Sequence, residues 1–417
     1  LGIKLAEIQD LDAALVIGSF LRKEQPLVAQ RLRQAAKKYT KVSFVSVGGD
    51  DQLIKQHQSF NVSPAHLTFV VAAIAKAAAY AKGGPAISGF DGIEPCEKAK
   101  AIAQSLIEGE KRHIFLGNVA EQHPEAATIH ALTQEIARLT GASFGFLGEA
   151  ANSLGGYVAG VLPTANGLNA YEMLVQPRKA YVVLGAELER DAHNAQLATT
   201  ALKQAAFTVV LTPFKDGAAA ETADALLPIA PFTETSGTFV NAEGRVQGFN
   251  GVVAPLGETR PGWKVLRVLG NVLGLSGFDF MSSEAVRDTV ISAKAEFATG
   301  LDNGLKDVTP AMAAAPAGLA RVADVPIHFA DMLARRSPAL QLTRDATAPS
   351  ARMNAATLSQ AGVADGASVV VKQGGGAATL VARLDESVPA GCVRVSAAHA
   401  TTAGLGDLFG AITVERA

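Results

Sequence analysis

The sequence has very little cysteine. Cys96 and Cys392 are the only two among 417 residues and lie far apart in the chain, which excludes a disulfide framework as the organising device of the fold. A cysteine-ligated iron–sulfur cluster usually needs four thiolates, sometimes with histidine replacing two of them. We therefore expect no such cluster within this stretch.

An excess of charge of either sign is also missing. The chain has 37 basic and 39 acidic residues, so no general affinity for nucleic acid or anionic membranes is expected.

Long apolar runs are absent as well. The longest candidate, Leu67 to Ala81, contains Lys76 and is mostly alanine, which favours a buried helix over a membrane span. Any connection to a membrane should then run through partner proteins.

The chain has neither an initiator Met nor a signal peptide. It opens at Leu1, and residues 11–17 already have the pattern of a core strand. We expect a fragment of a longer protein. With 48% hydrophobic and 18% charged residues, the composition is that of a well-packed globular protein, and the length predicts two or more domains.

Motifs for catalysis are absent too. No GxGxxG or GxxxxGK[ST] phosphate loop follows any predicted strand, and no SxxK nucleophile motif occurs. The one GxSxG match, residues 141–145, falls at the start of the predicted strand 142–149 and not at a strand-to-helix turn, where such a nucleophile would stand. The eight histidines form no ligand set. His123 and His130 could share a helical face, but no supporting ligand stands at i+3 or i+4, so we expect a surface helix there. We predict no catalytic, cofactor-binding or metal-binding residues in this chain.

One pattern occurs three times: an apolar strand that ends in glycine, an amphipathic helix and a second apolar strand. The first strands with their turns are residues 11–26, 111–124 and 179–194, and the second strands are residues 41–47, 142–149 and 207–214. This is the βαβ unit of an open parallel sheet. Continuous apolar strands indicate helices on both sheet faces. We predict an α/β body with doubly wound, Rossmann-like parallel sheets and helices that begin near Pro26 and Pro124.

The glycine turns are candidate anion sites. Gly18–Ser19, Gly117–Asn118 and Gly185 fall at the carboxyl ends of strands, where free helix N–H groups can bind phosphate. A tight structural turn is the favoured interpretation for each glycine.

Basic residues also gather early in the chain. They are Arg22, Lys23, Arg31, Arg33, Lys37, Lys38 and Lys41. With Leu27, Val28, Leu32 and Ala35 as the buried stripe of a helix from Pro26 to Tyr39, a solvated basic face is favoured over a phosphate or partner site.

The second half of the chain shows a different pattern of predicted elements. Residues 238–247 predict a hairpin with Gly244 at its turn, and a helix should run from Pro261 to Leu273 and end at Gly274. Residues 281–330 indicate helices and loops. After Pro349 the short strands 368–372, 378–384 and 392–397 predict a small β-barrel. We therefore place one domain at 1–345 and the barrel domain at 346–417.

Arg335–Arg336 stands close to that boundary. Two guanidinium groups could pin the two domains through carboxylates or carbonyls. Equally, they could mark an exposed helix end, where arginine favours the C-terminal dipole.

Four stretches together resemble one family. They are residues 18–38, 147–163, 235–247 (TSGTFVNAEGRVQ) and 331–343 (DMLARRSPALQLT). They are similar to the large iron–sulfur (G) subunits of NADH:quinone oxidoreductase, respiratory complex I, in the same order and over essentially the whole chain. The third stretch is shared with molybdopterin oxidoreductases in general, whereas the first and last look particular to the complex I branch.

The resemblance implies a molybdopterin-oxidoreductase-like body that follows an N-terminal portion with the iron–sulfur clusters. In catalytic relatives, Rossmann-like halves bind two pterin dinucleotides, and a Ser, Cys or selenocysteine ligates molybdenum. The complex I branch is understood to have lost that metal, and neither Cys96 nor Cys392 matches a family ligand motif. The loop from Gly237 to Arg245 lies near the pterin in catalytic relatives. Because a hairpin with a glycine turn suffices to explain this loop, we expect a structural role for it.

The leading hypothesis is thus a non-catalytic structural part of an oxidoreductase subunit, inactive as an isolated piece. Its expected partners are other peripheral-arm subunits, with no nucleic acid and no membrane span of its own. It would sit at the cytoplasmic side of the bacterial inner membrane. The alternative is the body of an active molybdopterin enzyme of the formate dehydrogenase or nitrate reductase type. A free-standing nucleotide-binding module would need a phosphate loop that the sequence lacks.

Overall fold

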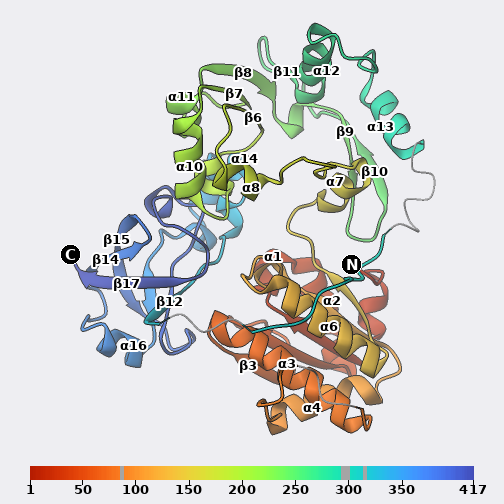
Figure 1. Cartoon of the computed structure of the whole chain (residues 1–417), viewed down its shortest axis with the longest axis vertical. Coiled ribbons are helices and arrows are strands. Elements are labelled where there is room, and N and C mark those ends of the chain that lie inside the picture. Colours follow the sequence, from red (N-terminus) through yellow and green to blue (C-terminus); the bar gives the residue numbers. More distant parts are fainter. Residues whose placement is uncertain (85–88, 293–300, 313–316) are drawn as a thin grey trace. The chain divides into compact units, whose positions relative to one another are not determined.

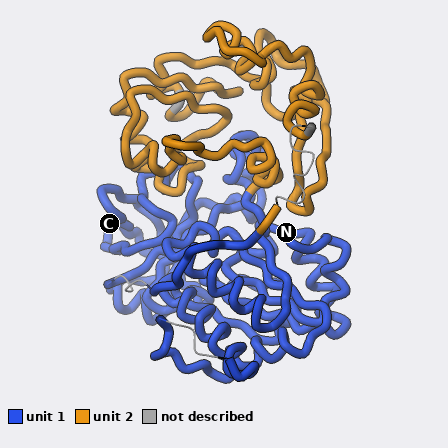
Figure 2. Tube along the Cα trace, turned by 45° about the vertical axis from the view of Figure 1, so that its right-hand side comes forward, with its two compact units in different colours: residues 1–149, 303–417 blue, residues 150–302 orange. Residues whose placement is uncertain are grey.

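The computed structural model describes residues 1–84, 89–292, 301–312 and 317–417. The chain divides into two compact units (Figure 2). Unit 1 consists of residues 1–149 and 303–417, and unit 2 consists of residues 150–302.

Unit 1 contains a five-stranded parallel sheet in the order β3-β2-β1-β4-β5, of which Figure 1 labels the edge strand β3. Its strands are β1 (Ala13–Ile17), β2 (Lys41–Ser46), β3 (Gln56–Asn61), β4 (Arg112–Leu116) and β5 (Ser143–Phe146). Every pairing in the sheet is parallel. The pairs β1–β2 and β4–β5 are two of the three predicted strand–helix–strand units, which are thereby confirmed.

Helices pack on both faces of this sheet. They are α1 (Leu21–Glu24), α2 (Pro26–Lys38), α3 (Pro64–Ala81), α4 (Glu97–Glu108), α5 (Asn118–Glu121) and α6 (Ala126–Thr140). Alternate residues of β1 point to opposite faces. Ala14 and Val16 pack with α2 in one core cluster, whereas Leu15 and Ile17 pack with α3, α4 and α6 in a larger one. All five β1 side chains are therefore buried.

The helix α3 is the one described helix that is long and apolar enough to cross a membrane, and 72% of its apolar window is buried within the protein. Its one charge is inside as well. The side chain of Lys76 is 2% exposed, and Nζ donates to the carbonyls of Asp91 at 2.8 Å and Ile93 at 2.5 Å. A buried cation needs such acceptors. The predicted buried helix over residues 67–81 is confirmed.

The rest of unit 1 is a small closed barrel in the order β12-β16-β13-β15-β14-β17. The strands are β12 (Leu319–Val322), β13 (Ala351–Met353), β14 (Ser368–Gln373), β15 (Gly376–Leu384), β16 (Cys392–Arg394) and β17 (Ala411–Arg416). Short helices α14 (Met332–Arg335), α15 (Pro338–Gln341) and α16 (Ala355–Gln360) connect them. Alternate residues of β14 and β15 fill the interior. The predicted terminal barrel is confirmed.

Unit 2 is built on a parallel sheet in the order β11-β8-β7-β6. Its strands are β6 (Ala180–Leu184), β7 (Phe207–Thr212), β8 (Ala225–Ala230) and β11 (Arg260–Pro261), and its helices are α7 (Ser153–Ala159), α8 (Ala170–Val175), α9 (Leu188–Asp191), α10 (Ala195–Gln204), α11 (Ala218–Thr222), α12 (Gly262–Val272) and α13 (Ser283–Ser292). The pair β6–β7 is the third predicted unit.

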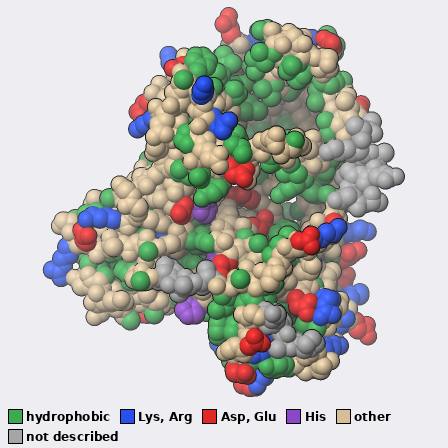
Figure 3. Space-filling model, in the orientation of Figure 1, with side chains coloured by type: hydrophobic (Ala, Val, Ile, Leu, Met, Phe, Trp, Pro, Cys, Tyr) green, Lys and Arg blue, Asp and Glu red, His purple; other side chains and the backbone are tan. Residues whose placement is uncertain are grey.

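The predicted hairpin is also present in unit 2, as β9 (Gly237–Val240) and β10 (Val246–Phe249). Gly244 has φ +82° at the turn, a conformation that favours glycine. The helix α12 ends before Gly274, which has φ +69°, as predicted. Hydrophobic side chains gather over α12 on the face seen in Figure 3, and Val268, Val272 and Leu273 are exposed.

Three details differ from the sequence-based expectation. Leu27, which was expected in the buried stripe of α2, is 68% exposed, because Ala29 and Ala36 occupy that stripe instead. Pro124 precedes the first turn of α6 and does not lie within it. Residues 319–322, within the stretch expected to form helices and loops, form the barrel strand β12. The division into domains 1–345 and 346–417 stays a prediction.

Candidate functional site

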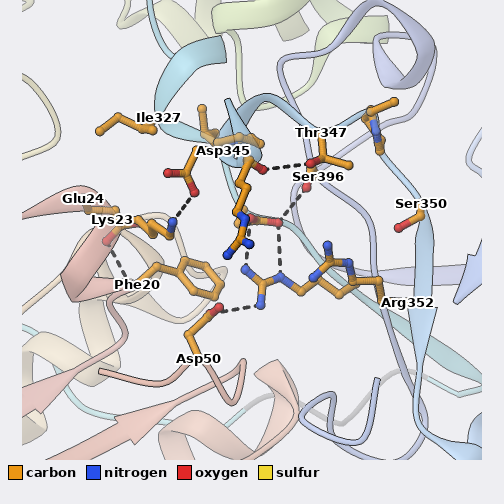
Figure 4. A pocket seen from close by; sticks show the side chains of 17 residues that line it. Phe20, Lys23, Glu24, Asp50, Ile327, Asp345, Thr347, Ser350, Arg352 and Ser396 are labelled. Atoms are coloured by element: carbon orange, nitrogen blue, oxygen red, sulfur yellow. Dashed lines mark hydrogen bonds and ion pairs between the residues drawn. The ribbon is translucent and has the colours of Figure 1, made fainter. Parts of the chain in front are cut away.

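A cavity of about 210 Å³ lies in unit 1 between the carboxyl ends of β1 and β2 and the barrel (Figure 4). Charged and polar side chains dominate its walls. Those from the first sheet are Lys23, Glu24 and Asp50, and those from the barrel and its connections are Asp324, Arg344, Asp345, Arg352, Arg394 and Ser396. Acids and bases are interspersed around the cavity, so its charge is largely compensated from within.

Arg394 links the barrel to the sheet. Its Nη1 donates to Asp50 Oδ2 at 2.9 Å, and its Nη2 donates to Asp324 Oδ2 at 3.0 Å. The guanidinium carbon lies 4.8 Å from the ring centroid of Phe20, a cation–π arrangement. Burial disfavours the charge of Arg394, yet the two carboxylates raise its pKa above the usual value. Burial acts against the Asp324 carboxylate too, but Arg394 and Ser396 lower its pKa. Arg394, Asp50 and Asp324 thus form one largely buried ion-pair network.

A second ion pair crosses the same cavity. Lys23, which follows β1, pairs with Asp345 of the segment before β13 (Figure 4). Both side chains are 40% exposed, so solvent weakens their attraction. Arg352 pairs with Asp385 at 3.6 Å. Three of the cations that line the cavity therefore already have carboxylate partners.

The carboxyl ends of β1 and β4 meet in close backbone contact. The N–H groups of Val119 and Ala120, at the start of α5, donate to the carbonyl of Gly18 at 3.0 and 3.3 Å. A Cβ atom on Gly117 would collide with Ser19 Cβ and lie 2.5 Å from Gly18 O, so only glycine fits. The predicted tight turns at Gly18–Ser19 and Gly117–Asn118 lie against each other here, at the ends of the adjacent parallel strands β1 and β4.

A carboxylate occupies the turn after β1. Glu24 accepts hydrogen bonds from Ser19 Oγ at 2.8 Å and from the backbone N–H of Phe20 at 3.1 Å. Burial raises the pKa of Glu24 to about 7 despite these bonds, and the charges of Asp324 and Glu149 add to the shift. The backbone N–H of Phe20, just before α1, thus already has an acceptor that the chain itself supplies.

Two more carboxylates share this edge of the sheet. Glu121 follows β4, and Glu149 follows β5. Burial raises the pKa of Glu121 to about 7, and repulsion from Glu149 and Glu24 adds to that shift. Burial also raises the pKa of Glu149, which accepts a hydrogen bond from Gln122 Nε2 at 2.7 Å. The edge is therefore acidic, and the raised pKa values mean that the charged forms of Glu121 and Glu149 are disfavoured there.

The other candidate residues lie away from this edge or have structural roles. Gly185 belongs to unit 2, where its N–H donates to Leu211 O at 2.9 Å. Of the basic cluster, Lys23 reaches the cavity, whereas Arg33, Lys37 and Lys38 are exposed on α2, as the solvated-face interpretation predicts.

The histidine prediction was partly wrong. His123 is 6% exposed, precedes α6 and bonds through Nε2 to Pro64 O at 2.9 Å, so it does not lie on a surface helix. It fixes the loop before α6 against α3. His130 lies on α6 and is half-buried, with Nε2 2.7 Å from Asn303 O.

The exposed-end interpretation of Arg335 is also wrong. Arg335 is 9% exposed and donates from Nε to Phe329 O at 2.7 Å, and Arg336 donates to Met332 O at 3.0 Å. The bond from Arg335 holds α14 to the preceding turn, and the bond from Arg336 folds its side chain back onto α14. A role for the pair in pinning the two domains stays a prediction.

Neither cysteine is part of the cavity lining. Cys96 is exposed before α4, and Cys392 is buried in β16, where burial raises its pKa to about 12. In the described part of the chain, no three His, Cys, Asp or Glu side chains form a metal-binding group.

Sequence reasoning missed the triad around Arg394, because Asp50 and Arg394 are 344 positions apart. One local signal did exist. Asp50 follows Gly48–Gly49 directly after a predicted strand, a position at the carboxyl edge of a parallel sheet where functional side chains are common.

The sequence profile of the molybdopterin oxidoreductase family matches residues 1–272. The NADH-ubiquinone oxidoreductase 75 kDa subunit of Reclinomonas americana is 24% identical over 277 residues, which cover 64% of this chain and 35% of that protein. The G subunit of NADH-quinone oxidoreductase from Shewanella oneidensis is 28% identical over 311 residues, with 64% and 33% covered. A nitrate reductase of Synechocystis sp. is 36% identical over 97 residues, with 23% and 14% covered.

The chain therefore spans roughly a third or less of the length of these relatives. Among solved structures, acetylene hydratase from Pelobacter acetylenicus superposes with a TM-score of 0.68 at 13% identity, over 97% of this chain and 77% of that one. At this identity the likeness concerns the fold alone.

Proposed function

Because the chain belongs to the molybdopterin oxidoreductase family, we propose that it is a non-catalytic, structural part of the G subunit of NADH:quinone oxidoreductase, respiratory complex I. Its two parallel sheets would be the doubly wound, Rossmann-like halves of an ancestral enzyme body. In this proposal the fold is retained as a scaffold, while the anion-binding positions at the strand ends serve the protein's own contacts.

One observation carries the non-catalytic part of the proposal. The N–H groups at the first turns after β1 and β4 are the usual positions for ligand phosphates. After β4 they donate to the carbonyl of Gly18, and after β1 the N–H of Phe20 donates to the Glu24 carboxylate. A phosphate would have to displace these acceptors and lie beside Glu24, Glu121 and Glu149. Like charges at short range oppose this strongly.

The cavity beside this edge gives independent support. Its volume of about 210 Å³ falls below the roughly 300–1,000 Å³ of pockets that hold drug-sized ligands, and a pterin dinucleotide is larger than such a ligand. Lys23, Arg352 and Arg394 already pair with carboxylates. The residues present here therefore do not fit an anionic pterin dinucleotide, and we derive no catalytic step through one.

The breadth of the similarities supports the complex I branch. Alignments to the two complex I subunits cover 64% of this chain each, whereas those to a nitrate reductase and a putative formate dehydrogenase cover 23% and 12%. The shorter matches are higher in identity, at 36% and 44%. They support the second candidate, the body of an active molybdopterin enzyme of the formate dehydrogenase or nitrate reductase type.

In the leading proposal, the enzyme activity, transfer of electrons from NADH to quinone, belongs to the whole complex. The iron–sulfur clusters would lie in an N-terminal portion of the full-length subunit, and this chain would contact other peripheral-arm subunits. The complex would hold it at the cytoplasmic side of the bacterial inner membrane.

The two candidates differ in what the protein carries when it is purified from its own cells. A tagged full-length protein, extracted in mild detergent, should co-elute with NADH:quinone oxidoreductase activity and contain no stoichiometric molybdenum, tungsten or pterin. Metal analysis and the fluorescence of oxidised pterin measure the second point. One molybdenum per chain together with formate oxidation or nitrate reduction would overturn the proposal in favour of the second candidate.

A further inference from the structure

A second cavity in unit 1 has a different character from the charged one. Its volume is about 220 Å³, and it lies beside the carboxyl ends of β4 and β5. The apolar walls are Leu116, Ala120, Ile129 and Phe146, and the two polar side chains are Glu121 and His130. At roughly 30 Å³ per water molecule, the space suits an occupant the size of about seven waters.

Glu121 lines this cavity at its rim, where the residue is exposed to solvent, and its carboxylate makes no described hydrogen bond. The carboxylates that act on it are Glu149 and Glu24, so the local potential is negative. An ionised carboxylate at the rim of an apolar cavity favours a cation whose apolar body fills the cavity while its N–H groups donate to the carboxylate.

His130 supplies a second acceptor. Its Nε2 lies 2.7 Å from the carbonyl oxygen of Asn303, and a carbonyl only accepts, so Nε2 carries the hydrogen. In the neutral ring, Nδ1 then holds a lone pair. The ring itself is fixed edge-on to Phe146, with 4.9 Å between centroids and 88° between planes. The aromatic wall is therefore rigid.

We propose that this cavity is a binding site for a small organic ammonium ion, with its apolar body between Ile129, Phe146 and the α6 alanines and its N–H groups directed to Glu121 and His130. Neither an anion nor a neutral apolar molecule satisfies both features. An anion would meet the negative potential of the three glutamates, and a neutral molecule would gain no charge-assisted hydrogen bond from Glu121.

Benzylamine is the probe, because it combines an aromatic ring with a primary ammonium group. Calorimetric titration of the 417-residue chain at pH 8 should show binding of benzylamine but none of benzyl alcohol or benzoate. Since burial raises the pKa of Glu121 to about 7, affinity should fall about tenfold from pH 8 to pH 6 as the carboxylate takes up its proton. Benzylamine stays cationic over that range.

Two variants separate this site from non-specific attraction to an acidic surface. Glu121→Gln should weaken binding at pH 8 at least tenfold and reduce the dependence of affinity on pH. Ala127→Leu should abolish binding by filling the space, because Ala127 lines the cavity and is exposed on α6. Glu110→Gln removes the same charge at the opposite edge of the sheet, before β4, and should leave binding unchanged.

Circular dichroism and thermal unfolding will establish that each variant is folded. Equal binding of benzylamine and benzyl alcohol, unchanged affinity in Glu121→Gln, or no binding of benzylamine at millimolar concentration would each overturn the proposal. None of these results bears on whether the protein belongs to complex I, because that question is tested by co-purification and metal content.

Discussion

At the scale of single residues, Arg394 has the largest expected effect on stability. It is 9% exposed, and it compensates two carboxylates that are 24% and 18% exposed. Removing one partner of a buried ion pair leaves the other charge uncompensated, which typically costs about 3–5 kcal/mol. We expect Arg394→Met to lower the free energy of unfolding by that amount, measured by urea denaturation at pH 7.

The matched control is an exposed pair in the same barrel. Lys372 and Glu415 are 48% and 55% exposed and lie 2.6 Å apart. Solvent screening limits such pairs to about 1 kcal/mol or less. Lys372→Met should therefore change the free energy of unfolding by at most about 1 kcal/mol. Similar losses in the two variants would mean that Asp50 and Asp324 do not depend on Arg394.

Glu24 should make stability depend on pH in an unusual direction for a carboxylate. Burial raises its pKa from 4.5 to about 7, so the folded state holds its proton more tightly than the unfolded chain does. Its contribution is fully present below pH 4.5 and is lost as the pH rises through 7. The free energy of unfolding should fall between pH 5 and pH 8 by about 1–3 kcal/mol on this account.

Glu24→Gln tests that direction, because the amide oxygen can still accept from Ser19 and Phe20 while no charge can form. Urea denaturation at pH 5 and pH 8 should show a smaller loss of stability for the variant than for the natural chain. Glu121 keeps part of the dependence, since its pKa is also raised. A variant with the same or a steeper decline would contradict the assignment to Glu24.

At the scale of elements, the close contact between the ends of β1 and β4 depends on the absence of a side chain at Gly117. Gly117 has ordinary extended backbone angles, φ −104° and ψ 178°, so alanine would suffer no backbone strain. The added Cβ would instead collide with Ser19 Cβ and lie 2.5 Å from Gly18 O. Overpacking of this kind costs about 1–3 kcal/mol. Gly117→Ala should lose that much stability in thermal or urea unfolding.

Gly92→Ala is the comparison for that substitution. Nothing lies within 4 Å of a Cβ on Gly92, and its φ is not positive, so the change should be neutral or slightly stabilising. If both variants are equally stable, the strand ends can separate at little cost. The backbone N–H groups of Val119 and Ala120, which now donate to Gly18 O, would then be available to a ligand.

The three βαβ units could be predicted because glycine-ended apolar strands followed by amphipathic helices are a local signal. The edge strand β3 could not, since QHQSFN is polar and half-exposed and its pairing with β2 is set by tertiary contact. For the same reason, Leu27 was placed in the wrong stripe. The apolar pattern of α2 does not say which of two adjacent apolar rows faces the sheet, and here small alanines pack closer.

The site was less accessible to sequence reasoning than the fold. The glycine turns were found, and their structural interpretation agrees with the contact between Gly18 and Gly117. The triad of Asp50, Asp324 and Arg394 joins three separate segments, so no spacing reveals it. The absence of a phosphate-loop motif was informative, because such a loop is contiguous in the sequence. A charge network can join distant segments, so its presence or absence cannot be judged from spacing.

At the scale of the whole molecule, the two units have very different cores. The larger core of unit 1 includes β1, α3, α4 and α6, with Leu15, Ile17 and Ile74 completely buried. The core cluster of unit 2 has five buried members in the described residues, and β6 alternates between buried and exposed positions. Apolar burial is the main source of stability, so the units should open with different free energies.

Hydrogen exchange measures this difference directly. Amides in β6 and β7 should exchange at least about tenfold faster, after correction for intrinsic rates, than those in β1 and β4, because local opening of unit 2 exposes less apolar surface. Both sets are read from one sample, so pH and temperature are shared. Equal protection would mean that the chain opens only as a whole. In that case unit 2 draws its stability from unit 1 and not from its own small core.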